Sequence, residues 1–100
     1  MSAVLLKLVI DEGVFAAVSD SLLMYEKAQL EFKSVSTRSY SNDQKLTEIK
    51  EKVAGYLAKV QIEIRTTQEE STDILAYLKE HHSRVVCDYL VIPVLDFGVL

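Results

Sequence analysis

The sequence predicts a mainly all-α fold, an antiparallel helical hairpin whose second helix is long and heptad-patterned. The chain of 100 residues has one proline and three glycines, so regular structure has few places where it must stop. Apolar residues recur at alternating steps of three and four through the second half. A polar, serine-rich segment separates that half from an earlier amphipathic stretch. A single helical domain over residues 1–100 is therefore expected.

The two ends of the chain lack a helical stripe. Residues 3–10 and 84–92 are rich in Val, Ile, Leu and Tyr, which favours short extended segments at both termini. Two interpretations stay open. The termini pair as antiparallel strands, with Gly13 close to the first strand-to-helix turn, or the second helix continues into Val91. Pro93 stops either structure.

The first helix is expected over residues 14–35. Its apolar side is formed by Phe15, Val18, Leu22, Tyr25, Gln29 and Phe32. A polar loop over residues 35–43 then reverses the chain.

The long helix is expected over residues 43–82. Ser41 and Gln44 have the spacing of a capping box. The seam runs through Leu46, Ile49, Val53, Tyr56, Val60, Ile64, Thr67, Ser71, Ile74, Leu78 and His81. Its register shifts between Val60 and Ile64, which is typical of a locally unwound coiled coil. Gly55 lies inside this helix and suggests a close helix crossing.

Composition excludes several classes of function. The net charge of −4 argues against nucleic-acid binding, which requires clustered Lys and Arg. With Cys87 as the only cysteine, no intrachain disulfide can form. No apolar run approaches the roughly 20 residues that span a bilayer, and the start lacks the basic region of a signal peptide. We expect no membrane span and a cytoplasmic protein, or one exported without a cleaved signal peptide.

The residues that could carry chemistry do not form a recognisable site. His81 and His82 are neighbours, so they point in different directions on a helix and are expected to cap its C-terminal end. Cys87 has no orienting partner or oxyanion loop in the sequence, which favours a buried structural cysteine. We therefore expect no catalytic residue, no cofactor, no metal and no small-molecule substrate. The chain is not predicted to be an enzyme.

Uncovered apolar surface predicts a protein partner or a homo-oligomer. A two-helix hairpin buries one face of each helix, and the segment over residues 84–100 is strongly apolar. The predicted partner-binding residues are Leu23, Leu30, Leu46, Ile49, Val53, Ile74, Leu78, Tyr89, Leu90 and Ile92.

The start Leu8-Val-Ile-Asp-Glu-Gly-Val-Phe-Ala-Ala-Val-Ser-Asp-Ser-Leu22, the polar loop and the long second helix resemble the small helical-hairpin proteins of type VII secretion. These are the WXG-like proteins and the small partners of LXG toxins. The chain departs from them in lacking tryptophan, and His81 stands where an acidic residue would follow Tyr77 in the export signal. The resemblance implies a non-enzymatic interaction module, a targeting partner or chaperone for a secreted toxin.

An alternative follows from the acidic residues Glu69, Glu70 and Asp73. A small regulatory or inhibitory protein, for example one encoded by a phage, would bind a basic site on its target through this helix face.

Overall fold

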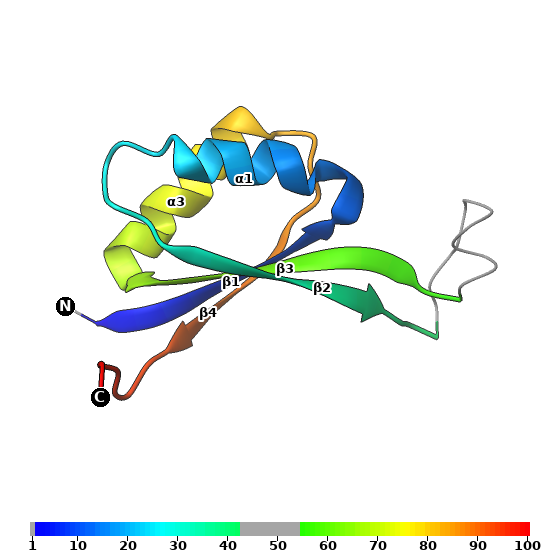
Figure 1. Cartoon of the computed structure of the whole chain (residues 1–100). Coiled ribbons are helices and arrows are strands. Elements are labelled where there is room, and N and C mark those ends of the chain that lie inside the picture. The colour runs from blue at the N-terminus through cyan, green and yellow to red at the C-terminus, as the bar shows by residue number, and fades with distance from the viewer. Residues whose placement is uncertain (1, 43–54) are drawn as a thin grey trace.

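The computed structural model describes residues 2–42 and 55–100, and it shows an α+β fold instead of a helical hairpin (Figure 1). In chain order, its elements are β1 (Ala3–Asp11), the 3-10 helix η1 (Glu12–Val14), α1 (Phe15–Leu23), β2 (Phe32–Ser39), β3 (Leu57–Thr67), α3 (Gln68–His81) and β4 (Asp88–Pro93). The prediction of a mainly all-α fold is therefore wrong.

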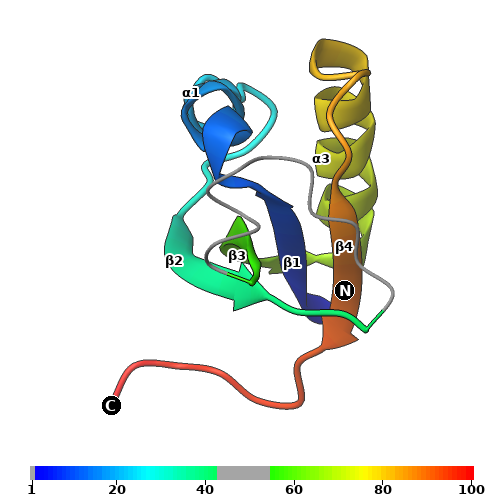
Figure 2. The same cartoon turned by 90° about the vertical axis from the view of Figure 1, so that its right-hand side faces the viewer.

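The four strands form one antiparallel sheet in the order β2-β3-β1-β4. Strands β1 and β3 lie at its centre and pair from Ala3↔Thr67 to Asp11↔Lys59. Both helices α1 and α3 cover the same face of the sheet, and within the described residues the opposite face carries no helix (Figures 1 and 2). This β-α-β-β-α-β arrangement is ferredoxin-like.

Strand β1 forms because its buried residues alternate along the chain. Val4, Leu6, Leu8 and Ile10 are buried, whereas the residues between them are half-buried. Side chains of a strand point to opposite faces in turn, so these four lie on the face beneath the helices. The alternation is hard to see in the sequence because Leu5 and Val9, on the other face, are apolar too.

The core lies between the helices and the central strands. Val18 and Leu22 of α1, with Ile74 and Leu78 of α3, are buried against the inner residues of β1 and β3. Complete burial of such a side chain contributes about 1.5–3 kcal/mol, so this single apolar layer is the main source of stability.

The predicted first helix over residues 14–35 is too long. Helix α1 ends at Leu23, and residues 32–39 form the edge strand β2, which pairs with β3 from Phe32↔Ile64 to Ser39↔Leu57. Most residues of β2 are polar and exposed, so its sequence lacks the apolar alternation of a buried strand. The backbone ladder offered by β3 decides its conformation.

The predicted long helix over residues 43–82 is also wrong. Its described part is divided between strand β3 and helix α3, although α3 does end at His81, close to the predicted end. Gln44, Leu46, Ile49 and Val53 lie outside the described residues. Gly55 has a φ of 77°, so it serves a turn before β3, and a Cβ added there would meet nothing within 4 Å.

The strand interpretation of the two termini is confirmed. Strands β1 and β4 pair antiparallel from Val4↔Pro93 to Val9↔Asp88. The backbone amide of Val94 then donates to the carbonyl of Ala3 at 3.1 Å, which continues the ladder past β4. Within residues 2–42 and 55–100, no helix is long and apolar enough to cross a membrane.

Candidate functional site

The face of the sheet opposite the helices, here called the outer face, carries apolar side chains with no helix over them. Leu5 and Val9 of β1 lie on it, next to Leu90 and Ile92 of β4. The side chain of Leu90 is 59% exposed and that of Ile92 is 36% exposed. An apolar sheet face without a covering layer is typical of an interaction surface.

Two ion pairs cross the outer face between the central strands. The amine of Lys7 lies 4.0 Å from a carboxylate oxygen of Glu63, and the amine of Lys59 lies 2.7 Å from that of Asp11. In both pairs the residues are direct partners in the β1–β3 register. Opposite charges at such positions favour this register and surround the apolar residues with polar groups.

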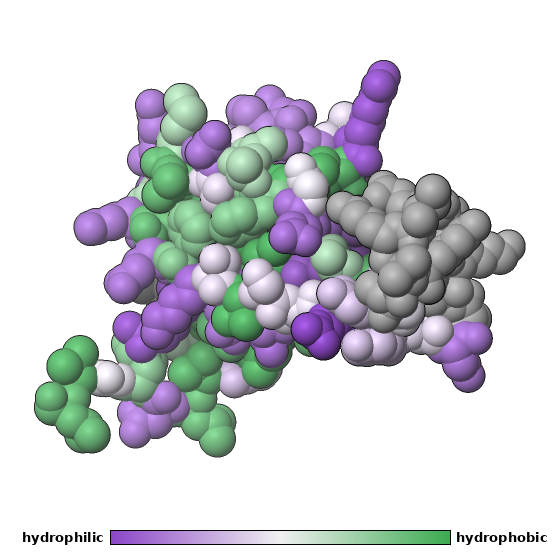
Figure 3. Space-filling model, turned by 45° about the vertical axis from the view of Figure 1, so that its right-hand side comes forward, coloured by the Kyte–Doolittle hydropathy of each residue, from purple (hydrophilic) through white to green (hydrophobic). Residues whose placement is uncertain are grey.

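The C-terminal segment over residues 94–100 passes below the sheet (Figure 2). There the guanidinium of Arg65 lies 4.8 Å from the ring centroid of Phe97, a cation–π contact. Leu95, Val99 and Leu100 are fully exposed. In Figure 3, hydrophobic side chains gather at the lower edge of the molecule and along the projecting segment. This segment enlarges the apolar surface instead of sealing it.

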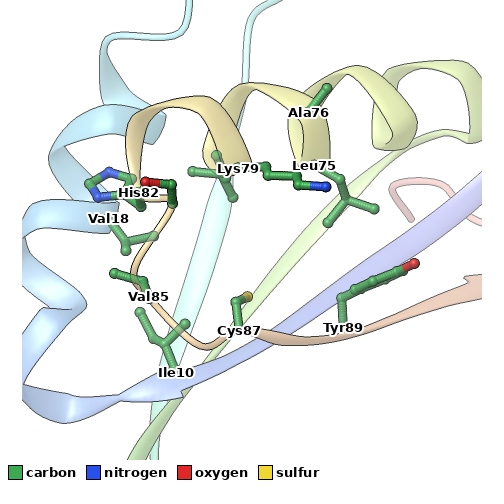
Figure 4. Close-up of a pocket in the computed structure, with 11 residues that line it drawn as sticks. Ile10, Val18, Leu75, Ala76, Lys79, His82, Val85, Cys87 and Tyr89 are labelled. Carbon is green, nitrogen blue, oxygen red and sulfur yellow. The ribbon is translucent and has the colours of Figure 1, made fainter.

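A cavity of about 450 Å³ lies between α3 and β4 (Figure 4). Its walls are largely apolar and include Ile10, Val18, Leu75 and Val85. Polar groups join them at its border, namely Lys79, His82, Ser83, Cys87 and Tyr89. Tyr89, near the start of β4, is 57% exposed.

The structure brings His82 and Cys87 to the same cavity. Burial raises the pKa of the Cys87 thiol, with a smaller contribution from the negative charge of Asp88, so the thiol is protonated and weakly nucleophilic at neutral pH. The Nε2 atom of His82 lies 2.7 Å from the hydroxyl of Ser21 in α1, which ties the ring to that helix.

A second cavity, of about 420 Å³, lies beside aromatic groups that join α1 to α3. The rings of Tyr25 and Tyr77 meet edge to face at 5.0 Å, and the hydroxyl of Tyr77 donates to the carbonyl of Ser21 at 2.7 Å. Burial and the charges of Glu70 and Asp73 raise the pKa of Tyr25. These contacts explain Tyr25 and Tyr77 as residues that pack between the two helices.

The acidic residues lie near the start of α3, and not in the middle of the predicted long helix over residues 43–82. Glu69 and Glu70 occupy its first turn, and the hydroxyl of Thr67 accepts from the backbone amide of Glu70 at 3.2 Å. Negative charge is favourable at this positive end of the helix dipole. At the other end, Nδ1 of His81 donates to the carbonyl of Tyr77 at 2.9 Å, the capping role expected for it.

The described residues contain no group of three or more His, Cys, Asp or Glu side chains that could hold a metal ion. In the same part of the chain, every buried side-chain nitrogen or oxygen has a hydrogen-bond partner. Recognition of a small molecule would therefore depend on the half-exposed polar groups around a cavity.

A family model described as a protein of unknown function, DUF3240, matches residues 1–100. The chain belongs to the DUF3240 family. No curated protein is similar enough in sequence to count as a relative.

Solved structures share the fold of this DUF3240 protein. A DUF3240 family protein from Shewanella baltica OS155 is 19% identical with a TM-score of 0.77, over 100% of this chain and 98% of the other. CPII from Thiomonas intermedia K12, a nitrogen regulatory PII-like protein bound to ADP, AMP and bicarbonate, is 11% identical with a TM-score of 0.64, over 99% and 98%. Arabidopsis thaliana PII bound to citrate is 16% identical with a TM-score of 0.65, over 93% and 78%.

The family and the fold correct the resemblance to type VII secretion proteins. A ferredoxin-like sheet replaces the helical hairpin and the coiled coil on which that resemblance rested. The role of a targeting partner or chaperone for a secreted toxin consequently has no support. The expectation of no small-molecule substrate is not supported either, because proteins of this fold are bound to ADP, AMP or citrate.

The predicted partner-binding residues of the DUF3240 chain fall into separate groups. Ile74 and Leu78 are buried in its own core, and Leu30 packs against that core. Leu23 is exposed on the helical layer, whereas Tyr89, Leu90 and Ile92 are exposed on β4. Leu46, Ile49 and Val53 lie outside the described residues. Leu5 and Val9 of the outer face were missed, and the period-2 pattern of β1 is the signal that could have found them.

Proposed function

We propose that this DUF3240 chain is a non-enzymatic regulatory protein that works as an assembly of identical copies and responds to a small molecule. The apolar outer face carries this proposal, because Leu5, Val9, Leu90 and Ile92 form a surface that no helix within residues 2–42 and 55–100 covers. The likeness in fold to PII-like proteins supports it, since CPII is a nitrogen regulatory protein bound to ADP and AMP, and Arabidopsis thaliana PII is bound to citrate.

Self-association fits the outer face better than a docked peptide would. The face is broad and spans adjacent strands, and its ion pairs alternate with apolar residues in rows across the sheet. Two such faces bury apolar area against each other while each keeps its own charges paired. The surface is therefore suited to contact a copy of itself.

The test is molar mass in solution by light scattering on a size-exclusion column, at several concentrations. We expect an oligomer for the natural chain and dissociation for Leu90→Glu, because moving a carboxylate from water into an apolar contact between two faces is unfavourable. Leu23→Glu is the matched control, since Leu23 is exposed on the helical layer. A monomeric natural chain at all concentrations would contradict the proposal, as would a control that dissociates while Leu90→Glu does not.

The small-molecule part is tested separately by melting temperature. ADP, AMP, citrate and short carboxylates are each titrated against the folded chain, and binding to the native state alone raises the midpoint. If none of these compounds changes the melting temperature or the molar mass, the proposed response to a small molecule is contradicted.

The acidic helix face of Glu69, Glu70 and Asp73 is the second candidate, as an inhibitor surface, and it begins with the pair Glu69 and Glu70. Their position in the first turn of α3 already has a structural reason in the helix dipole. The outer face has no such internal explanation, and the proposal therefore rests there.

A further inference from the structure

We propose that the cavity between α3 and β4 binds a small amphiphilic carboxylate, an acid with a short aliphatic chain, with Lys79 as the group that pairs with the carboxylate. This rests on the proposed function, because it assigns a site and a ligand class to the regulatory small molecule.

The walls favour an aliphatic group. Ile10, Val18, Leu75 and Val85 come from β1, α1, α3 and the segment before β4, and they surround the space drawn in Figure 4. The volume of about 450 Å³ lies in the usual range for small-molecule sites. Apolar walls without buried polar groups give no recognition of a sugar or a base, but they stabilise hydrocarbon by about 25 cal/mol per Å² buried.

The charges favour a negative head group. None of the described residues that line the cavity is Asp or Glu, although acidic residues outnumber basic residues in the chain. Lys79 and His82 stand at its border, and the ring of His82 is held by Ser21. Within the described ranges, Lys79 forms no ion pair. Among the described residues that line this cavity, Lys79 therefore supplies an ammonium without a carboxylate partner.

The position of Lys79 allows it to contact both the aliphatic chain and the carboxylate of a ligand. Figure 4 shows its side chain lying along the border of the cavity, between His82 and Leu75. Its methylene groups can pack on an aliphatic ligand while the ammonium meets the carboxylate. The nearby carbonyls of the last turn already accept bonds: the backbone amide of His82 donates to Leu78 at 2.8 Å, and His81 donates to Tyr77. These bonds reduce the competition for Lys79 from the helix end.

The thiol of Cys87 supplies a direct readout, because it lines the same cavity and is the only cysteine. Octanoate is the probe for the purified full chain, and alkylation of Cys87 by iodoacetamide is followed by intact mass. Octanol has the same chain without the charge, and acetate has the charge without the chain. We expect saturating octanoate to slow alkylation by about tenfold, with little protection by the other two at equal concentration.

Two variants test the contact. Lys79→Met keeps the aliphatic stem and should weaken octanoate binding about tenfold, the loss expected for one charge-assisted hydrogen bond. Lys27→Met is the matched control, because Lys27 lines the second cavity. Its affinity for octanoate should be unchanged, and both variants should keep the melting temperature of the natural chain.

Three outcomes would overturn the inference: no protection of Cys87 by octanoate, equal protection by octanol, or an unchanged affinity in Lys79→Met. If ADP or citrate raises the melting temperature without protecting Cys87, the proposed function stands and this site falls. If Cys87 is protected but the chain is a monomer unaffected by Leu90→Glu, this site stands and the assembly falls.

Discussion

Cys87 shows how burial changes the chemistry of a single residue. Its half-buried thiol has a raised pKa, chiefly from desolvation. At pH 8 we therefore expect it to react with iodoacetamide more slowly than glutathione does, since the thiolate is the nucleophile. The rate should rise as the pH increases through the range above the ordinary thiol value.

Unfolding provides the control for this prediction. In concentrated urea, Cys87 should react as fast as glutathione, because its environment is then water. Since the folded-state pKa is the higher one, the contribution of Cys87 to stability is fully present below the unfolded pKa and is lost as the pH rises through the folded pKa. A folded chain that reacts at the glutathione rate would contradict the burial described here.

Thr67 is a second residue whose role the structure decides. Its hydroxyl accepts from the amide of Glu70 and begins α3, although the sequence seemed to place Thr67 inside a longer helix. Thr67→Ala should lower the free energy of unfolding by about 1 kcal/mol, measured by urea denaturation. Thr67→Ser should retain most of the stability, because it keeps the accepting oxygen. Equal losses in both variants would show that the cap contributes little.

At the scale of elements, β3 explains why the heptad prediction failed. Val60 and Ile64 are four residues apart, a spacing that suits a helix and a strand equally. Ile62 between them is the decisive residue, because all three are buried on one face of β3. The run of alternating apolar and polar residues from Val60 to Arg65, rich in β-branched side chains, was the available strand signal.

Substitutions in β3 distinguish the two-residue repeat of a strand from the repeat of about 3.6 residues in a helix. Ile62→Ala should lower the free energy of unfolding by about 2–5 kcal/mol through loss of apolar contact and the cavity left behind. Its neighbour Gln61 lies on the outer face. Gln61→Ala should change the free energy of unfolding by less than about 0.5 kcal/mol. Urea denaturation at a concentration where the chain is in one assembly state measures both. Similar effects at the two positions would contradict the strand.

Considered as a whole, the molecule has its most extensive backbone pairing at the centre of the sheet. Strand β1 pairs on both sides, with β3 and β4, whereas β2 and β4 each pair on one side within the chain. Amide hydrogen exchange by mass spectrometry should therefore be slowest in β1 and β3 and faster in β4. Exchange in β4 as slow as in β1 would show that another copy pairs with this edge.

Parts of the candidate site were visible in the sequence, and parts were not. The end of α3 near His82 and a role at the surface for Leu90 and Ile92 were predicted from composition and short-range pattern, and the terminal strands were one of two open interpretations. The cavity could not be predicted, because its walls come from segments as distant as Ile10 and Val85. Sequence spacing does not specify which distant segments meet.

The sequence by itself determined which residues are apolar, where α3 ends and that both termini favour extended structure. Only the tertiary structure decided that residues 32–39 form a strand, that Ile74 and Leu78 belong to the core, and that one sheet face is left uncovered. The physical reason is the antiparallel ladder. A polar segment becomes β2 because β3 offers it backbone partners, and the register of that pairing fixes which side chains face the helices.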